Sequence, residues 1–371
     1  MTREAVSEVL TARTRSNARR GRWVAGAALA ALTLAGCGGN DAGGANPSSS
    51  KGGHEYASLS GQLKASGASF PDAFYQEVVI AFREAAPNVT VTYNATGSGT
   101  GKKEFAQGLT DFAGTDSLVK ESDGLPAGSF YYLPTVAAPI TVSYNLSGVD
   151  KLQLSPDTLA KIFQRDIKTW NAPEIAVDNP GVSLPDKPIT VVHRSDGSGT
   201  TNNFTKYLTA AAPTWRLGSG DTVNWPTDTQ GAERNSGVAQ LIKQGDGTIG
   251  YVDLSDAKAS GLRFAAIQNK EGEYVEPSLD AATAALAGAR VNDDLTYDPL
   301  DAAGADSYPI TAPTYLLVKA EYDDPAKAEL VKAFVTYLLT DAQALAAEVD
   351  FAQLPDSLRQ KALAQLDKVK A

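Results

Sequence analysis

The tetrapeptide Gly-Ser-Gly-Thr occurs twice in the chain, at residues 97–100 and 197–200. Each copy follows a predicted strand and precedes a predicted helix. A glycine-rich turn lets backbone N–H groups approach a ligand, and the following helix directs its unpaired donors and its positive dipole end to the same point. Arg194 stands just before the second copy and adds a cation. Two such turns predict one small oxyanion held between two halves of the protein.

Strands and helices alternate along the rest of the chain, which predicts an α/β fold. The predicted strands cover residues 89–93, 111–115, 136–144, 189–193, 248–252 and 314–318. The predicted helices cover residues 71–86, 156–163, 200–208, 325–338 and 358–369. Residues 171–188, 211–235 and much of 268–308 are rich in Gly, Pro, Asp and Asn, which is typical of loops.

The first 36 residues have the pattern of an export signal. Arginines precede an apolar run of 12 residues, 24–35, which is short for a membrane span. The run ends in Leu-Ala-Gly-Cys, a bacterial lipobox, so we expect residues 1–36 to be removed and Cys37 to be lipidated. The alternative is an ordinary signal peptide followed by a free thiol at Cys37. Residues 37–57 are predicted to form a flexible tether.

The composition excludes several classes of function. Without residues 1–36 the chain has 27 basic and 41 acidic side chains, a net charge of −14, which argues against nucleic acid and anionic lipid as partners. Repulsion is screened within roughly 8–10 Å, so a buried site can still bind an anion. With one cysteine and two histidines, an intrachain disulfide and a His/Cys metal cluster are excluded, and no cofactor is expected. Thr96 and Lys103 break the pattern of a nucleotide-binding P-loop.

Four short segments carry polar groups that suit one oxyanion. They contain Ser69 with Phe70, Ser98, Asp116, and the run from Arg194 to Thr200. Each has a simpler interpretation: a plain turn, a helix cap at Ser69, or a solvated loop carboxylate at Asp116. Together they supply hydroxyls, backbone N–H groups, a guanidinium and a carboxylate.

These segments resemble the PstS family, the phosphate-binding components of bacterial phosphate ABC importers. The resemblance covers the runs 66–71, 93–101, 111–116, 133–136, 191–200, 249–252, 308–311 and 350–356. It implies that hydroxyls, backbone N–H groups and the Arg194 guanidinium donate to phosphate, while Asp116 accepts the phosphate proton. Sulfate has no such proton at neutral pH, so Asp116 would select phosphate. The implied donors besides Arg194 are Ser69, Phe70, Ser98, Ser198, Gly199 and Thr200.

The resemblance also implies a two-lobed periplasmic-binding-protein fold of type II, with a mixed sheet in each lobe and helices on both faces. Lobe I would contain residues 58–138 and 312–371, and lobe II residues 139–311. The hinge would have two segments, 136–141 and 310–314. Ser69, Ser98 and Asp116 would then face residues 194–200 across the cleft.

The implied function is capture of phosphate outside the cytoplasm by a lipid-anchored monomer on the outer face of the cell membrane. Hinge closure would present phosphate to permease subunits driven by a cytoplasmic ATPase, with no chemical reaction. Alternatives are a binding protein for another tetrahedral oxyanion such as arsenate, a secreted phosphohydrolase, or a phosphate sensor using the same site. His193 and the tryptophans 170, 215 and 225 are expected to be structural, and Asp196 to orient Arg194.

Overall fold

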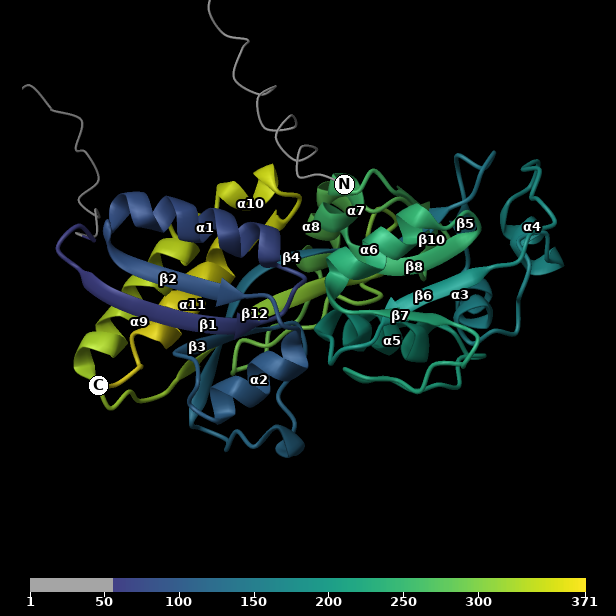
Figure 1. The fold of residues 1–371 in the computed structure, drawn as a ribbon. Helices are drawn as coiled ribbons and strands as arrows, with labels where there is room; N and C mark the ends of the chain where they lie inside the picture. Colours follow the sequence, from purple (N-terminus) through teal and green to yellow (C-terminus); the bar gives the residue numbers. More distant parts are fainter. Residues whose placement is uncertain (1–55) are drawn as a thin grey trace, which may run out of the picture. The chain divides into compact units, whose positions relative to one another are not determined.

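The computed structural model describes residues 56–371. The predicted signal peptide, the lipidation site Cys37 and the tether up to residue 55 lie outside the described residues. From residue 56 onward, strands and helices alternate as the sequence predicted (Figure 1). No helix in this part of the chain is long and apolar enough to cross a lipid bilayer.

One mixed sheet of ten strands organises the described residues, along the path β2-β1-β3-β12-β4-β8-β6-β7, with β13 and β9 also paired to β4. Its strands are β1 (Ser60–Gly67), β2 (Asn88–Asn94), β3 (Phe112–Thr115), β4 (Phe130–Asn145), β6 (Thr190–Arg194), β7 (Gln230–Ala232), β8 (Thr248–Asp253), β9 (Arg263–Phe264), β12 (Thr311–Lys319) and β13 (Ala352–Gln353). A separate three-stranded sheet contains β5 (Gln153–Leu154), β10 (Ala266–Gln268) and β11 (Tyr274–Val275). Parallel pairs lie toward both ends of the large sheet, and antiparallel pairs surround β4.

The 16-residue strand β4 belongs to both halves of the large sheet. Residues 130–139 pair with β12, and residues 140–145 pair with β8. Residues 132–144 are all buried, which is typical of a strand covered on both faces. The two mixed sheets that the sequence predicted therefore share one strand. The N–H of Ile140 donates to the carbonyl oxygen of Ile310 at 2.8 Å. The two predicted hinge segments, 136–141 and 310–314, therefore lie side by side.

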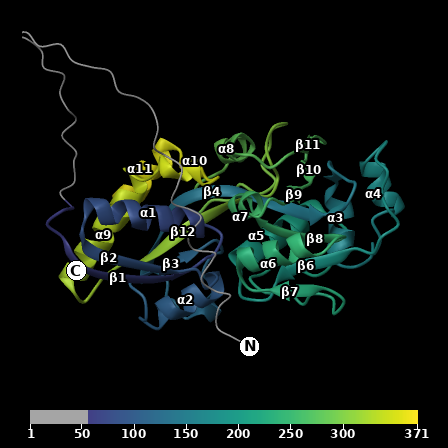
Figure 2. The same ribbon diagram turned by 45° about the horizontal axis from the view of Figure 1, so that its top comes forward.

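Helices cover the sheet in layers. They are α1 (Asp72–Ala85), α2 (Ser98–Ala106), α3 (Pro156–Phe163), α4 (Pro173–Asp178), α5 (Gly199–Ala211), α6 (Arg234–Gln244), α7 (Leu254–Ala259), α8 (Leu279–Ala287), α9 (Pro325–Leu339), α10 (Leu345–Glu348) and α11 (Asp356–Leu366), with a 3₁₀ turn η1 (Glu121–Asp123). At the β1–β3 end, α1, α9, α10 and α11 pack together on one face, and α2 packs on the other (Figures 1 and 2). At the β8–β6 end, α6 packs on both strands, while α5 contacts β8 and α3.

The four-residue spacing that predicted α1 corresponds to its buried face. Phe74, Val78 and Phe82 are buried, and the ring of Phe82 packs on that of Phe334 in α9 with centroids 5.3 Å apart. Burial of such side chains supplies about 1.5–3 kcal/mol each, which fixes α1 and α9 on the sheet. The loop that joins β1 to α1 and carries Ser69 is therefore held at both ends.

Two loop predictions were wrong in part, because residues 171–188 contain a helix and residues 211–235 contain strand β7 and the start of another helix. Residues 171–188 include α4, in which Pro173 occupies the first turn and Ile175 is buried. Residues 268–308 include α8, an alanine-rich helix capped by the Ser278 side chain. Helix α6 begins at Arg234, before the end of the predicted loop at 235. Helix α4 ends in aspartate and α8 has aspartate in its first turn and glycine at its C-cap, and these residues concealed the helical patterns.

Candidate functional site

The two Gly-Ser-Gly-Thr turns lie against each other. The backbone N–H of Gly99 donates a hydrogen bond of 2.9 Å to the carbonyl oxygen of Gly197. The first turn leads into α2 and the second into α5, so the N-termini of both helices open at this contact. The first N–H groups of a helix have no partner within it, and together with the helix dipole they favour an anion. Two turns far apart in the sequence thus form one corner that offers the donors an anion needs.

Glycine is required in these turns because two chain segments approach closely. A Cβ on Gly199 would lie 2.5 Å from Oγ of Ser98 and 2.6 Å from Cβ of Asp116. A Cβ on Gly97, whose φ is +89°, would lie 2.5 Å from Oδ2 of Asp196. A side chain at either position would force the two turns apart.

The four predicted hydroxyl donors share one arrangement, in which each oxygen accepts a hydrogen bond from the protein. The pairs are Thr201 N–H to Ser198 Oγ at 3.0 Å, Asp116 N–H to Ser98 Oγ at 3.2 Å, Asn235 N–H to Ser69 Oγ at 3.3 Å, and Arg194 Nη1–H to Thr200 Oγ1 at 3.5 Å. A hydroxyl that accepts such a bond still has its own proton to donate. All four side chains are buried. These contacts orient the hydroxyls as donors.

The backbone donors differ in their availability. The N–H of Ser198 already donates to the carbonyl oxygen of Asp221 at 2.9 Å, so Ser198 offers its hydroxyl rather than its N–H. Gly199 begins α5, where N–H groups lack acceptors within the helix. The ring of Phe70 is buried against that of Phe351, with centroids 5.8 Å apart. That packing fixes the loop in which Phe70 and Ser69 lie.

Arg194 ends β6 and its side chain is 1% exposed. Its Nε donates to Oδ1 of Asp196 at 2.6 Å, and its Nη2 donates to Oδ2 of the same carboxylate. The prediction that Asp196 orients Arg194 is confirmed. A third bond, from Nη1 to Oδ1 of Asn235 at 2.8 Å, fixes the plane of the guanidinium. This fixed fork leaves one N–H, on Nη2, without a partner among the described residues, and Nη2 would lie 3.4 Å from a Cβ on Gly97, on the side of that turn.

Asp116 follows β3 directly and is buried. Its Oδ1 accepts a hydrogen bond from Thr314 Oγ1 at 2.7 Å, and its Oδ2 lies 3.4 Å from Ser98 Oγ. Burial raises the pKa of Asp116 to about 7, against the lowering effects of the Thr314 hydrogen bond and the Arg194 charge. A carboxyl group that titrates near neutrality accepts a hydrogen bond when ionised and donates one when protonated.

Asn235 is a central residue of the site that the sequence did not indicate. It is fully buried in the first turn of α6. Besides accepting from Arg194 and donating its N–H to Ser69, it donates through Nδ2 to Oδ2 of Asp253 at 2.9 Å. Asn235 thereby connects two predicted ligand residues. It lies in a stretch predicted to be a loop, where an asparagine suits an ordinary turn.

Two further missed residues hold Asp116. Asn203 donates to the backbone oxygen of Asp116 at 2.6 Å and to that of Gly199 at 3.0 Å, and Thr314 donates to the carboxyl group. Asn203 stands four residues after Gly199 and therefore shares its face of α5, which is a signal the sequence did carry. Thr314 is separated from Asp116 by 198 residues, so only the pairing of β12 with β3 brings them together.

His193, Trp170 and Trp225 have the structural roles expected of them, because they pack or form hydrogen bonds within the fold. The ring nitrogens of His193 contact the Arg194 carbonyl oxygen at 2.9 Å and Thr229 Oγ1 at 3.0 Å, and burial lowers its pKa. The imidazole stacks on Trp225 with centroids 4.9 Å apart. Trp170 is fully buried and donates to the carbonyl oxygen of Gly247. These side chains hold β6 and its neighbours in place.

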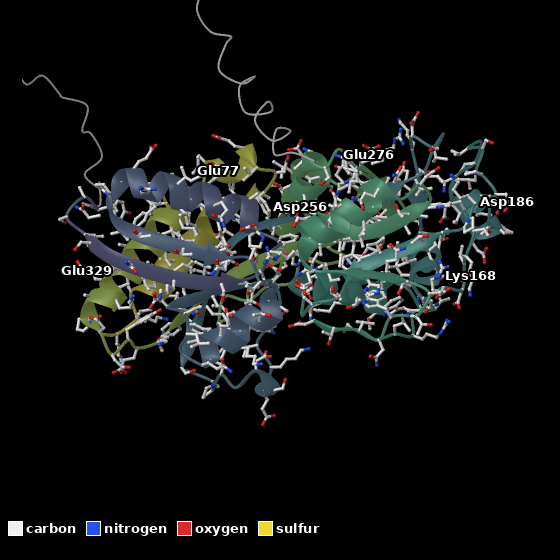
Figure 3. The ribbon with its side chains drawn as sticks, viewed as in Figure 1. Glu77, Lys168, Asp186, Asp256, Glu276 and Glu329 are labelled. Atoms are coloured by element: carbon white, nitrogen blue, oxygen red, sulfur yellow. The ribbon has the colours of Figure 1, made fainter. Side chains whose placement is uncertain are left out.

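The excess negative charge lies on the outside. Glu77, Asp186, Glu276 and Glu329 are exposed and lie on four different elements or loops around the ribbon (Figure 3). At the site the guanidinium of Arg194 and two helix N-termini supply positive charge over distances shorter than the screening length. The acidic surface and the anion site are therefore compatible.

Known proteins share both the sequence and the fold. Residues 52–342 match the PBP superfamily domain. The chain is 38% identical over 308 residues to the phosphate-binding protein PstS of Methanocaldococcus jannaschii, covering 76% of this chain and 79% of that protein. It is 34% identical over 371 residues to phosphate-binding protein PstS 2 of Mycobacterium tuberculosis, covering 95% and 99% of the two chains.

Solved structures establish the type II fold. A high-affinity periplasmic phosphate-binding protein (PfluDING) bound with phosphate is similar with a TM-score of 0.67 and 23% identity, over 82% of this chain and 93% of that one. A putative phosphate ABC transporter substrate-binding protein from Clostridium perfringens gives a TM-score of 0.60 at 16% identity, over 80% and 100%. The α/β fold with mixed sheets flanked by helices is as predicted. The chain belongs to the PBP superfamily and, within it, to the PstS family of phosphate-binding proteins.

Proposed function

We propose that the protein binds inorganic phosphate outside the cytoplasm and delivers it to an ABC importer. The observation that carries the proposal is a buried acceptor, Asp116, at a point where donors converge from α2 and α5. Phosphate at neutral pH has unprotonated oxygens that need donors and a proton that needs an acceptor. The relatives are named as phosphate-binding proteins, which supports the same ligand.

Eight residues contact phosphate in this proposal. Hydroxyls of Ser69, Ser98, Ser198 and Thr200, backbone N–H groups of Phe70, Gly199 and Thr200, and the guanidinium of Arg194 donate, while Asp116 accepts. The hydrogen bonds that orient the four hydroxyls support these roles. Charge-assisted bonds contribute about 1.5–3 kcal/mol each, so a few of them account for micromolar binding at about −8 kcal/mol.

Binding is coupled to hinge closure. We assign residues 58–138 and 312–371 to lobe I and residues 139–311 to lobe II, with hinge segments at 136–141 and 310–314. The change of partner along β4 near residue 140 supports this division. Opening separates the turn at Gly97 from that at Gly197, so phosphate favours the closed state, in which donors from both lobes meet.

The selectivity of the site follows from Asp116. Sulfate has no proton to share with an ionised carboxylate and leaves two acceptors facing each other in a buried site. Arsenate is protonated like phosphate and has the same shape. The same donors and the same acceptor would therefore bind it as a second ligand.

The protein performs no chemical reaction in this proposal. A secreted phosphohydrolase would need an activated nucleophile or a metal cluster. The obvious base for Ser198 is His193, but both of its ring nitrogens are engaged by Arg194 and Thr229. Turnover of a chromogenic phosphate ester by the purified protein would overturn this part of the proposal.

The location and partners follow from the N-terminal sequence and the family. Lipidation at Cys37 would hold the monomer on the outer face of the cell membrane, and permease subunits with a cytoplasmic ATPase would receive the phosphate. The same site would also serve a phosphate sensor. Mass spectrometry of the membrane fraction tests the anchor, since an unmodified Cys37 would contradict it.

Calorimetric titration tests the central claim. A soluble fragment beginning near Glu55 is unfolded, stripped of bound phosphate and refolded, and then titrated with phosphate and with sulfate. At about pH 9, where Asp116 is almost fully ionised, we expect tight one-to-one binding of phosphate and no heat from sulfate. Absence of phosphate binding, or equal binding of both ions, would contradict the proposal.

A further inference from the structure

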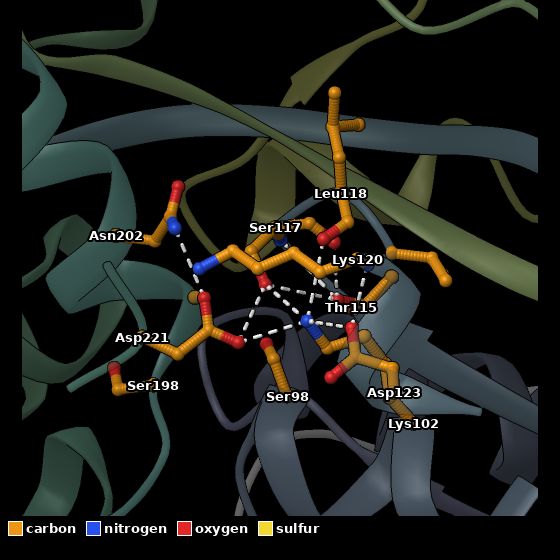
Figure 4. Close-up of polar contacts among 12 residues, drawn as sticks. Ser98, Lys102, Thr115, Ser117, Leu118, Lys120, Asp123, Ser198, Asn202 and Asp221 are labelled. Atoms are coloured by element: carbon orange, nitrogen blue, oxygen red, sulfur yellow. Dashed lines mark hydrogen bonds and ion pairs between the residues drawn. The ribbon is translucent and has the colours of Figure 1, made fainter. Parts of the chain in front are cut away.

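Lys102 is a fully buried lysine behind the anion site. It lies in α2, four residues after Ser98, and therefore on the same face of the helix. Its Nζ contacts Oδ2 of Asp221 at 2.8 Å and Oδ2 of Asp123 at 3.0 Å, as Figure 4 shows. It also donates to Ser117 Oγ at 3.2 Å and to the backbone oxygen of Leu118 at 3.3 Å. An ammonium group buried with this many acceptors is a specific feature, because an unpaired one would be prohibitively costly.

Asp221 connects this lysine to the second turn. Its Oδ1 accepts from Asn202 Nδ2 at 3.0 Å, and its backbone oxygen accepts the N–H of Ser198 at 2.9 Å. Its Oδ2 also accepts from Ser117 Oγ at 3.1 Å, one residue after Asp116. One carboxylate therefore contacts the N-terminal part of α5 on one side, and α2 and the end of β3 on the other (Figure 4).

The two carboxylates differ in where they lie. Asp123 is in η1, between β3 and β4, and follows Lys102 by only 21 residues in the sequence. Asp221 follows Lys102 by 119 residues and lies in the loop between α5 and β7. Under the lobe assignment above, Asp123 belongs to the same lobe as Lys102, and Asp221 to the opposite one. Opening the cleft would break the pair with Asp221 and leave Lys102 paired with Asp123.

We propose that Lys102 and Asp221 are positioning residues that hold the two anion-binding turns together and slow the release of phosphate. The inference rests on the proposed phosphate binding and adds a specific residue pair to it. Neither side chain contacts the ligand. The pair forms only when the turns meet, so it stabilises the closed state, and Asp123 keeps the lysine charge compensated when the cleft opens.

The pair should act mainly on dissociation. Phosphate leaves only after the turns separate, and a contact made solely in the closed state raises the barrier to that step. Removing one partner of a buried, hydrogen-bonded charge pair changes the dissociation rate more than the association rate. Asp221→Asn keeps the size of the side chain and leaves the Lys102–Asp123 pair in place, so the fold is preserved.

The test measures phosphate release from four proteins: wild type, Asp221→Asn, Lys102→Met and the double variant. Each is loaded with radiolabelled orthophosphate and chased with excess unlabelled phosphate, and association is followed separately. We expect dissociation at least about 10-fold faster in Asp221→Asn, with association changed less than about 3-fold. The double variant should dissociate about as fast as the faster single variant, well below the product of the two single effects, since both changes break one contact.

A matched control separates this role from general stability. Asp166→Asn breaks an exposed pair with Arg216, away from the turns, and should leave phosphate release unchanged. Unchanged release in Asp221→Asn, while the wild type binds phosphate, would overturn the inference. So would a lowered melting temperature of the ligand-free variant without faster release, which would indicate a merely structural pair. A wild type that fails to bind phosphate would instead overturn the proposed function itself.

Discussion

Thr314 donates a hydrogen bond of 2.7 Å from its hydroxyl to Oδ1 of Asp116. The bond directs that oxygen toward β12 and leaves Oδ2 facing the beginning of α5, where a Cβ on Gly199 would lie 2.7 Å from it. Oδ2 is therefore the oxygen that we expect to accept the phosphate proton. Its only fixed donor among the described residues is the Ser98 hydroxyl at 3.4 Å, a long contact that a bound anion can replace.

Sulfate binding should depend on pH through Asp116. The pKa of this group is raised to about 7, so the carboxyl is protonated at lower pH and can donate to a sulfate oxygen, whereas above it the carboxylate repels sulfate. We expect sulfate affinity to be almost level from about pH 5 to 6 and to fall by about tenfold per pH unit from about pH 8 to 9, above the pKa. Calorimetric titration of sulfate at several pH values checks this. Sulfate affinity that stays constant across that range would contradict it.

Asp116→Asn should remove both the selectivity and its pH dependence. The amide can donate as well as accept, so sulfate is no longer opposed by an obligatory acceptor. We expect the preference for phosphate over sulfate to fall by about 100-fold at about pH 9, where the wild-type carboxyl group is almost fully ionised. Asp186→Asn, an exposed change far from the turns, serves as the control. A preference that survives in Asp116→Asn would mean that another group selects the ligand.

Local sequence patterns were sufficient to predict most helices and strands and the two turns that meet at the site. Ser155 and Asp324 cap their helices through their side chains, and the alternating residues before each turn form β2 and β6. The Gly-Ser-Gly-Thr turns were recognisable because glycine and serine at a strand-to-helix junction carry their conformational and hydrogen-bonding roles with them.

Contacts between distant segments could not be predicted in this way. Asn235 and Thr314 reach the site only because α6 and β12 pack beside it, and each is an ordinary residue in its own segment. The same is true of Asp221, which lies in a loop of unremarkable composition. The sequence places Lys102 on the same helix as Ser98 but does not show that the side chain is buried, because tertiary packing determines burial. The hinge and the lobe boundaries stay predictions of the family resemblance.

Arg194→Lys should weaken phosphate binding although it keeps the charge. The guanidinium donates to Asp196 through two nitrogens and to Asn235 through a third, and these bonds fix its plane. A lysine ammonium cannot make the bidentate pair and still reach the ligand. We expect the Kd for phosphate to rise about 10- to 100-fold, as measured by calorimetry. Arg216→Lys at an exposed pair is the control, and equal effects of both changes would refute a specific role for the Arg194 fork.

Gly199→Ala should prevent the two turns from closing. The new Cβ would lie 2.5 Å from Ser98 Oγ and 2.6 Å from Asp116 Cβ, distances that force one segment to move. Because these neighbours come from the other turn and from the end of β3, the conflict is relieved by opening, and the rest of each half is undisturbed. We expect the Kd for phosphate to rise about 10- to 100-fold, while the ligand-free protein melts close to the wild-type temperature.

The matched control for that change is Gly288→Ala. Gly288 ends α8 with an ordinary φ of −95°, and a Cβ there meets no atom within 4 Å. The Kd of Gly288→Ala for phosphate should equal that of the wild type, because this substitution tests only the loss of a glycine. If Gly199→Ala bound phosphate as tightly as Gly288→Ala does, α5 and Asp116 would not need to approach so closely in the liganded state. The donors at the start of α5 and the acceptor at Asp116 would then have to act on phosphate from positions farther apart than this structure gives them.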